Sequence, residues 1–245
     1  MAYLDGFVAP VPTHKQQAFL DHAARMDAAF IRHGATRVVE CWGDDLAHGT
    51  VTDFTRAVQA GDDETVVFSW IHWPDKTTRN RAWAAMMDPA NPDAAMDPAR
   101  NPPPFDGKRM IFGGFEPLLT RDEHGAFPYV QGFLTPAPST GREAYAAAAQ
   151  EGWTMMEGLG ALGVLEAWSD DVPRGSRTDC YRAVNASEDE AVVFSYVIWP
   201  SREICQQAAT RMAEMDMPEG MALPFDPARM IYGGFQPIFD LGAQA

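Results

Sequence analysis

Hydrophobic and polar positions follow two different periods along this chain. One early segment has a single apolar stripe at helical spacing, which predicts a helix that ends before Gly34. The stripe consists of Phe19, Ala23, Met26 and Phe30. Residues 65–73 are instead hydrophobic on both sides of the strand period, which is typical of a central strand with both faces buried. The pattern therefore predicts a sheet covered by amphipathic helices.

Further segments complete the predicted order of elements. Residues 3–9 have a strand pattern that ends in a Pro-x-Pro turn, and residues 36–42 are rich in β-branched side chains. Residues 51–58 are expected to be extended, a second helix is expected to begin after Pro74, and residues 109–115 are expected to form the last strand. The order β-α-β-β-α-β, with one extra edge segment, is that of a ferredoxin-like unit.

The same pattern occurs twice. Residues 3–12 return as residues 129–138, 126 positions later, and the Val-Val-Phe-Ser sequence at 66–69 returns unchanged at the same distance. Residues 109–115 return 120 positions later. A repeat of this length is the size of a domain. The shorter second distance arises in the proline-rich residues 88–104, for which we expect a surface loop, with a lid as the alternative.

We therefore expect two tandem ferredoxin-like repeats, at residues 1–119 and 127–245. Each unit carries its helices on one face of its sheet, so the other face needs a cover. The second copy can provide that cover. The expected fold is α+β, with the two sheets packed face to face as an intramolecular dimeric α/β barrel, or pseudo-dimer; whether two chains associate further is left open.

The composition limits the classes of molecule that the protein could bind. The net charge is −15 and the pI is about 4.7, which argues against nucleic acid and against an anionic membrane surface. No segment has the length of a transmembrane helix, and the first residues lack the basic start of a signal peptide, so we expect a cytoplasmic protein. Cys41, Cys180 and Cys205 do not recur between the copies and predict no disulfide framework.

The repeat also limits the chemistry. A site present in both copies must be built from residues present in both copies, yet all six histidines and all three lysines precede the second copy. This excludes a duplicated histidine or metal site, and no nucleotide-binding or Cys-x-x-Cys motif occurs. We expect no cofactor and no metal. The recurring polar pairs include Glu40 with Glu166 and Arg56 with Arg182.

Strand alternation sorts these residues by face. It places Glu40 and Trp42 on one face of their strand, and Asp5 with its aromatic neighbours on one face of the first strand. We expect both faces to point into the space between the sheets. The candidate catalytic residues are Glu40, Glu166 and Asp5. The candidate ligand-binding residues are Trp42, Trp168, Arg56, Arg182, Phe68, Phe194, Trp70, Tyr196 and His72. In the alternative, Glu40 and Arg56 form a buried ion pair and the aromatic residues are core.

Several motifs resemble the YbaA-like family of bacterial proteins of unknown function. They are the Tyr-x-Asp-Gly-Phe-x-x-Pro-x-Pro start, Glu-Cys-Trp-Gly-Asp-Asp at 40–45, Val-Val-Phe-Ser-Trp at 66–70 and Phe-Asp-Gly-Lys-Arg-Met-Ile-Phe-Gly-Gly-Phe at 105–115. The resemblance implies the dimeric α/β-barrel superfamily, which includes cofactor-independent monooxygenases, haem enzymes, isomerases and ligand-binding proteins. It supplies no catalytic residues, and this chain departs from it by carrying two copies.

Three functions stay open on the sequence alone. The first is binding of a small apolar or aromatic molecule between the two sheets. The second is a cofactor-independent oxidoreductase or isomerase of the small-monooxygenase type, with a buried carboxylate as base and an arginine beside the developing anion. The third is a structural or interaction module with a packed interior. The content of the barrel interior distinguishes these possibilities.

Overall fold

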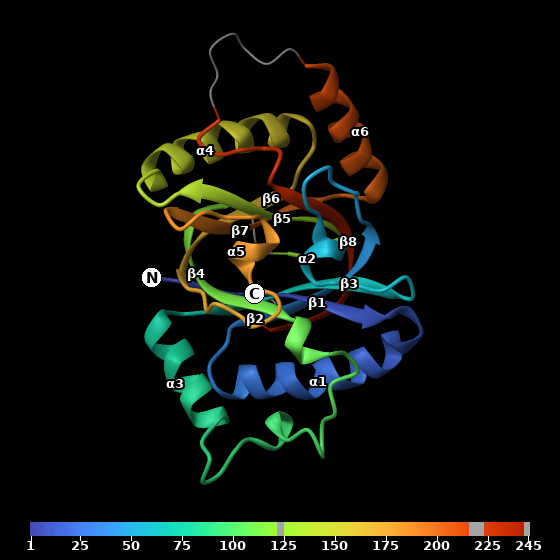
Figure 1. Ribbon diagram of the computed structural model, residues 1–245, viewed down its shortest axis with the longest axis vertical. Coiled ribbons are helices and arrows are strands. Elements are labelled where there is room, and N and C mark those ends of the chain that lie inside the picture. Colours follow the sequence, from blue (N-terminus) through green and yellow to red (C-terminus); the bar gives the residue numbers. More distant parts are fainter. Residues whose placement is uncertain (122–124, 216–222, 243–245) are drawn as a thin grey trace.

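A computed structural model describes residues 1–121, 125–215 and 223–242. Eight antiparallel strands form a closed barrel, with helices on two opposite sides of it (Figure 1). The strands are β1 (Tyr3–Pro12), β2 (Arg37–Asp45), β3 (Glu64–Trp73), β4 (Ile111–Arg121), β5 (Tyr129–Pro138), β6 (Gly163–Asp171), β7 (Glu190–Trp199) and β8 (Ile231–Gly242). The helices are α1 (Gln16–Arg32), α2 (Phe54–Ala57), α3 (Lys76–Met86), α4 (Arg142–Gly158), α5 (Cys180–Ala183) and α6 (Arg202–Glu214), with one-turn 3-10 segments at Thr13–Lys15, Ala94–Met96 and Gly107–Arg109.

The barrel order is β1-β3-β2-β8-β5-β7-β6-β4. In the first half of the chain, β1 lies between β3 and β4, and β2 pairs with β3; the second half repeats this arrangement. The two halves join along β2–β8 and β4–β6. Helices α1 and α3 cover the first half, and α4 and α6 cover the second (Figure 1). The predicted α+β class and the closure of the two sheets into one barrel are confirmed.

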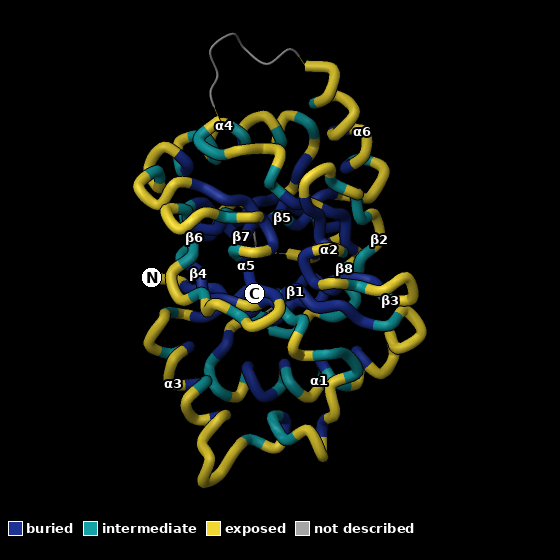
Figure 2. The backbone as a smooth tube through the Cα atoms, viewed as in Figure 1, coloured by how far each residue is buried: buried dark blue, intermediate teal, exposed yellow. Residues whose placement is uncertain are grey.

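Aromatic side chains pack against one another at the centre of the barrel, where the binding site was expected. The rings of Phe68 and Phe194 stack at 4.5 Å between centroids, and those of Trp70 and Tyr196 stack at 4.2 Å. All four side chains are buried, and the strands at the centre of the molecule are largely coloured as buried in Figure 2. Gly6 faces this stack because a Cβ there would lie 2.6 Å from the Phe194 ring. The expected binding site between the two sheets is therefore wrong in its location.

The prediction of which strand faces point inward is wrong for β1 and β2. Their inward residues are Leu4, Val8, Val39 and Cys41, which belong to the barrel core. Glu40 and Asp5 lie on the opposite face, toward the helices, as their Cα positions alternate with those of the inward residues. The reason is physical: the close-packed aromatic centre offers a carboxylate neither water nor a partner. For β3 the prediction is right, since Phe68 and Trp70 point inward.

Residues 51–58 do not form the extended segment that their pattern predicts. They include the short helix α2, because the Asp53 side chain accepts a hydrogen bond from the Arg56 backbone N–H and caps the helix start. Asp179 caps α5 in the same way in the second half. Both helices contribute buried residues to the barrel core, and they contact each other.

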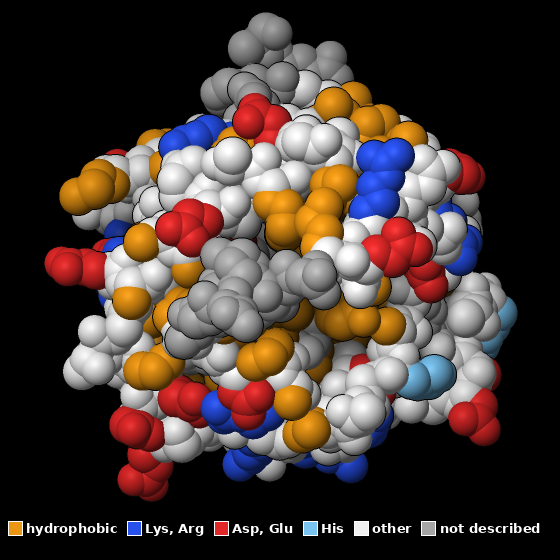
Figure 3. Space-filling model, turned by 90° about the horizontal axis from the view of Figure 1, so that it is seen from above, with side chains coloured by type: hydrophobic (Ala, Val, Ile, Leu, Met, Phe, Trp, Pro, Cys, Tyr) orange, Lys and Arg blue, Asp and Glu red, His pale blue; other side chains and the backbone are white. Residues whose placement is uncertain are grey.

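The halves are also joined by matching polar contacts. The Tyr3 hydroxyl donates to Asp170 at 2.8 Å, and the Tyr129 hydroxyl donates to Asp44 at 3.1 Å. Seen from the side of α4 and α6, acidic and basic side chains are interspersed on the surface (Figure 3). Within the described residues, no helix combines the length and the hydrophobicity needed to cross a membrane.

Candidate functional site

A substantial pocket lies outside the barrel, in the first half of the chain. It has a volume of about 550 Å³ and sits between the outer face of β1–β3, helices α1 and α3, and residues 87–112. Its apolar lining includes Phe7, Phe19, Met26, Phe30, Trp83, Met96, Phe105, Met110 and Phe112. Its polar lining consists of His22, Asp27, Glu40, Ser69, Arg79 and Asn101. This is the usual make-up of a small-molecule site, with a few polar groups in an apolar cavity.

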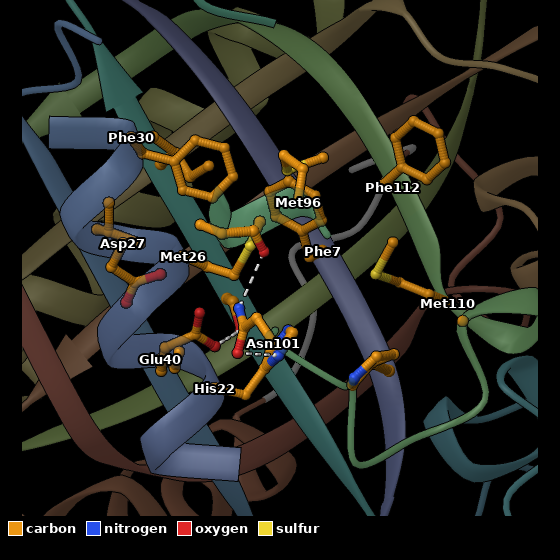
Figure 4. A pocket seen from close by; sticks show the side chains of 18 of the residues that line it. Phe7, His22, Met26, Asp27, Phe30, Glu40, Met96, Asn101, Met110 and Phe112 are labelled. Carbon is orange, nitrogen blue, oxygen red and sulfur yellow. Dashed lines mark hydrogen bonds between the residues drawn. The ribbon is translucent and has the colours of Figure 1, made fainter. Parts of the chain in front are cut away.

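The two ends of the pocket differ in chemistry. The carboxyl groups of Asp27 and Glu40 lie near each other on one side, and Phe112 and Met110 lie on the other (Figure 4). Phe112 is 41% exposed and stacks on Phe7 with 6.4 Å between ring centroids. The aromatic side therefore reaches the surface, whereas the acidic side is buried.

Glu40 reaches the pocket from β2, where Ser69 of the neighbouring strand β3 stands directly opposite it. The Ser69 hydroxyl donates a hydrogen bond to Glu40 Oε2. Burial raises the pKa of the Glu40 carboxyl from 4.5 to about 7, and the Ser69 hydrogen bond opposes part of this effect. A carboxyl group with this pKa can accept or release a proton near neutral pH.

Asp27 enters the same cavity from α1, on the buried side of the helix. It is 1% exposed, and within the described parts of the chain its Oδ2 atom has no hydrogen-bond partner. Burial, together with the nearby Glu40 carboxyl, raises the pKa of Asp27 well above its usual range. A buried carboxyl oxygen without a partner is rare because it forfeits its hydration, so its presence in a cavity calls for an explanation.

Asp5 occupies a separate, saturated cluster beside the pocket. It accepts from Arg79 Nε at 2.9 Å and from the indole N–H groups of Trp73 and Trp83 at 3.0 and 2.9 Å. Arg79 also donates to Asp171 of the second half at 2.6 Å. Asp5 therefore has its full set of partners, and its geometry indicates that it positions Arg79 and Trp83 along the pocket wall.

Residues 87–112 form one wall of the pocket and are fastened to α1. Asn101 is buried and accepts from Arg25 Nε at 2.9 Å, while its amide N–H donates to the Ala95 carbonyl. His22 Nδ1 lies 3.0 Å from the same Asn101 oxygen, and burial lowers the pKa of His22. The proline-rich segment thus contributes side chains to the cavity in addition to its place on the surface.

The second half places different residues at the matching positions. Tyr145 replaces Phe19 and Trp153 replaces Asp27, each 126 positions later. The Tyr145 hydroxyl donates to Glu166 at 3.1 Å, and Trp153 is packed in the core under α4. Burial raises the pKa of Glu166 to about 7, as for Glu40. Glu166 thus has a hydrogen-bond donor from helix α4, the Tyr145 hydroxyl. Phe19, at the matching position of α1, has no polar group to donate to Glu40.

The structure places the other predicted site residues outside this pocket. The Glu40–Arg56 ion pair of the alternative interpretation does not form: Arg56 is half exposed and donates to Asp53 at 2.8 Å, and Arg182 pairs with Asp179 at 3.6 Å. Both arginines follow their capping aspartates by three residues, so the short helices hold them at the surface.

The predicted aromatic residues are separated by the barrel wall. Phe68, Phe194, Trp70 and Tyr196 form the interior stack, and His72 Nε2 lies 3.2 Å from the Tyr196 hydroxyl. Trp42 packs on Phe19, with 6.1 Å between centroids, and Trp168 packs on Tyr145 in the second half. Of the predicted site residues, Glu40 is therefore the one that lines the pocket.

Sequence reasoning overlooked Asp27, His22, Asn101 and the role of Arg79. A signal for Asp27 was present: it follows Met26 on the apolar side of α1, and the matching residue in the second copy is Trp153. A carboxylate at a position where the repeat carries a buried aromatic residue is a polar exception to an apolar pattern. Within the described residues, no cluster of three or more potential metal-ligating side chains is found.

Solved structures with the same fold have little sequence similarity to this chain. An anthrone oxidase-like protein is 13% identical, with a TM-score of 0.55 over 100% of this chain and 95% of that protein. A candidate monooxygenase from Lactobacillus acidophilus NCFM is 12% identical, with a TM-score of 0.56 over 99% of this chain and 96% of that protein. At this identity the comparison establishes the shared fold and carries no activity with it.

Sequence relatives are closer. The uncharacterized protein YbaA of Escherichia coli K12 is 47% identical over 119 residues, which cover 49% of this chain and 98% of YbaA. The family described as protein of unknown function DUF1428 matches residues 2–107 and again residues 128–227. The resemblance noted from the motifs is thereby confirmed, and the chain belongs to the DUF1428 family.

Proposed function

We propose that this protein binds a small, largely apolar molecule in the pocket between the first-half sheet and helices α1 and α3. The observation that carries the proposal is a cavity of about 550 Å³, lined by aromatic and methionine side chains and closed at one side by buried polar groups. Ligand pockets of this kind measure roughly 300–1,000 Å³. Methionine side chains adapt to ligands of different shape, which favours a binding site over a rigid core gap.

The two-unit organisation is part of the same proposal. We infer that residues 1–119 and 127–245 are ferredoxin-like repeats that act as a pseudo-dimer. The strand order β4-β1-β3-β2 in the first half, with α1 and α3 on one face, supports this assignment. In this arrangement, one repeat carries the binding pocket and the other completes the barrel that supports it.

Binding can be measured with the uncharged fluorescent probe N-phenyl-1-naphthylamine. We expect one probe molecule to bind per chain, with a rise in fluorescence, because its two aromatic groups match an apolar cavity of this size. Ala23 lines the pocket on α1 and is buried, so Ala23→Phe is expected to weaken probe binding at least about tenfold by occupying the cavity.

The matched control makes the same change on an exposed face. Ala85 lies on α3 and is exposed, so Ala85→Phe should leave the dissociation constant within about twofold. Equal binding by wild type, Ala23→Phe and Ala85→Phe would place the probe elsewhere and contradict the proposal. Unfolding curves of the three proteins would verify that each is folded at the temperature of the measurement.

A cofactor-independent oxygenase is the second candidate function. It is favoured by Glu40, whose carboxyl has a pKa of about 7 and faces an apolar pocket, and by the fold shared with an anthrone oxidase-like protein. In such a reaction Glu40 removes a proton from an acidic carbon of the substrate. The carbanion then transfers electrons to O₂, and the oxygenated product loses water to leave a ketone.

Anthrone is a suitable probe for this candidate, because its oxidation by one O₂ gives anthraquinone and water. The oxygenase function predicts anthrone-dependent oxygen uptake above the buffer rate, reduced at least about a hundredfold in Glu40→Gln and unchanged in Glu166→Gln. An oxygen electrode measures both rates. Uptake no faster than in buffer, together with tight probe binding, would leave binding as the function of the pocket.

A further inference from the structure

We propose that the pocket selects apolar molecules that carry a protonated amine, with the ammonium group bound between Asp27 and Glu40. The inference rests on the proposed binding function and specifies the class of ligand. The ammonium N–H groups donate to Asp27 Oδ2 and to the Glu40 carboxylate, and the apolar body of the ligand lies along the aromatic and methionine side chains toward Phe112.

The first argument is the missing hydrogen-bond partner. Asp27 is 1% exposed and faces the pocket, yet its Oδ2 is unpartnered among the residues that the structure describes. The Ser69 hydroxyl provides Glu40 with one donor, although a carboxylate has room for several. The acidic side of the pocket therefore has more hydrogen-bond acceptor positions than the one donor that Ser69 provides, and a ligand bearing several N–H donors is its complement.

The second argument is the balance of charge around the pair. Of the described residues that line the pocket, Arg79 is the one permanent cation. Arg79 is already shared between Asp5, at 2.9 Å, and Asp171, at 2.6 Å. From α1, His22 also faces the cavity, but its pKa is lowered by burial, so it is neutral near pH 7. The described lining residues from 87–112 contribute no titratable group.

The third argument comes from the second half, where the position that matches Asp27 carries no charge. Trp153 stands in place of Asp27, and the Tyr145 hydroxyl donates to Glu166. A single buried carboxyl with a hydroxyl partner needs no cation. Two buried carboxyls that line one cavity do benefit from a cation: burial raises the pKa of both, and the Glu40 carboxyl raises that of Asp27 further. The acidic pair is therefore specific to the half that contains the pocket.

Three naphthalene compounds of similar shape test this inference by calorimetric titration: 1-naphthylmethylamine, 1-naphthalenemethanol and 1-naphthoic acid. At pH 8.5 we expect the amine to bind at least about tenfold more tightly than the alcohol, since a charged hydrogen bond is stronger than a neutral one by roughly this factor. The acid should bind more weakly than both, because its carboxylate would meet Asp27 and Glu40.

Two variants locate the selectivity. Glu40→Gln should reduce the amine-to-alcohol ratio to less than about threefold while the alcohol still binds, and Asp27→Asn should act in the same direction. Glu166→Gln removes the matching charge in the other half and should leave the ratio unchanged. Because the chain has a net charge of −15, amine binding must also be blocked by Ala23→Phe to count as binding in the pocket.

The pH dependence gives an independent readout. An ionised fraction of Glu40 that grows as pH rises past about 7 should tighten amine binding about fourfold between pH 6.5 and 8.5, and Glu40→Gln should abolish this change. Alcohol binding equal to or tighter than amine binding would overturn the inference and leave the proposed function intact. Failure of all three compounds and of the neutral probe to bind would overturn the proposed function itself.

Discussion

Glu40→Gln should make the protein more stable at pH 8 and leave its stability nearly unchanged at pH 4.5. Burial raises the pKa of Glu40 from 4.5 to about 7, so the folded state holds this proton more tightly than the unfolded chain does. The free energy of unfolding therefore falls as pH rises from about 4.5 to about 7. At one pKa unit per 1.36 kcal/mol, the loss is about 3 kcal/mol.

The glutamine variant cannot ionise, so it avoids this loss, and its amide oxygen can still accept from Ser69. Urea unfolding at the two pH values measures the difference directly. Glu166→Gln should behave similarly, because burial also raises the pKa of Glu166 to about 7. Glu157 is exposed, and Glu157→Gln controls for the loss of one negative charge. A stabilisation of Glu40→Gln equal at both pH values would contradict the explanation.

The second large effect concerns the cluster beside the pocket. Arg79→Cys should lower the free energy of unfolding by about 3 kcal/mol at pH 8, because it leaves the buried Asp5 carboxylate without its cation. The loss should be smaller at pH 5. Burial already raises the pKa of Asp5 against the opposing effect of Arg79, so Asp5 takes up a proton more readily once the arginine is gone.

The second half of the chain indicates which second substitution should restore the stability of this variant. In the second half, Gln131 stands in place of Asp5 and Cys205 in place of Arg79, and Gln131 accepts from the Trp199 indole at 3.2 Å. Asp5→Gln should therefore recover most of the stability of Arg79→Cys, and the double-mutant cycle should give a coupling energy of about 2 kcal/mol or more. Additive losses would mean that the two residues act independently.

The residues that differ between the two halves at these positions share one feature. The first half holds Asp5, Asp27 and Arg79 where the second half holds glutamine, tryptophan and cysteine. Each change in the second half removes a buried charge, which lowers the cost of desolvation. The first half retains its buried charges next to a cavity, as expected where stability is given up for binding.

Much of the architecture could be predicted from the sequence. The central strand at residues 65–73, the apolar stripe of α1 and the repeated order of elements all correspond to structure. These features depend on local periodicity and on glycine and proline, which act within a few residues. The expected extended segment at residues 51–58 failed for a local reason as well, because Asp53 caps a short helix there.

The location of the site could not be predicted in the same way. Strand alternation separates two faces, but β1 and β2 are buried on both, one by the barrel interior and the other by α1 and α3. With hydrophobic residues on each side, periodicity cannot tell which face is inward. Glu40 was singled out as a candidate carboxyl but assigned to the wrong face of β2.

The repeat, most of the strands and helices, and a set of candidate carboxyl groups that includes Glu40 follow from the sequence alone. The location of the cavity, and the fact that Asp27 from α1 and Glu40 from β2 both line it, follow from the folded chain. The difference lies in the distance over which the interactions act. Secondary structure is set by neighbours along the chain, whereas a pocket is the space left when distant elements pack, and its volume depends on every side chain around it.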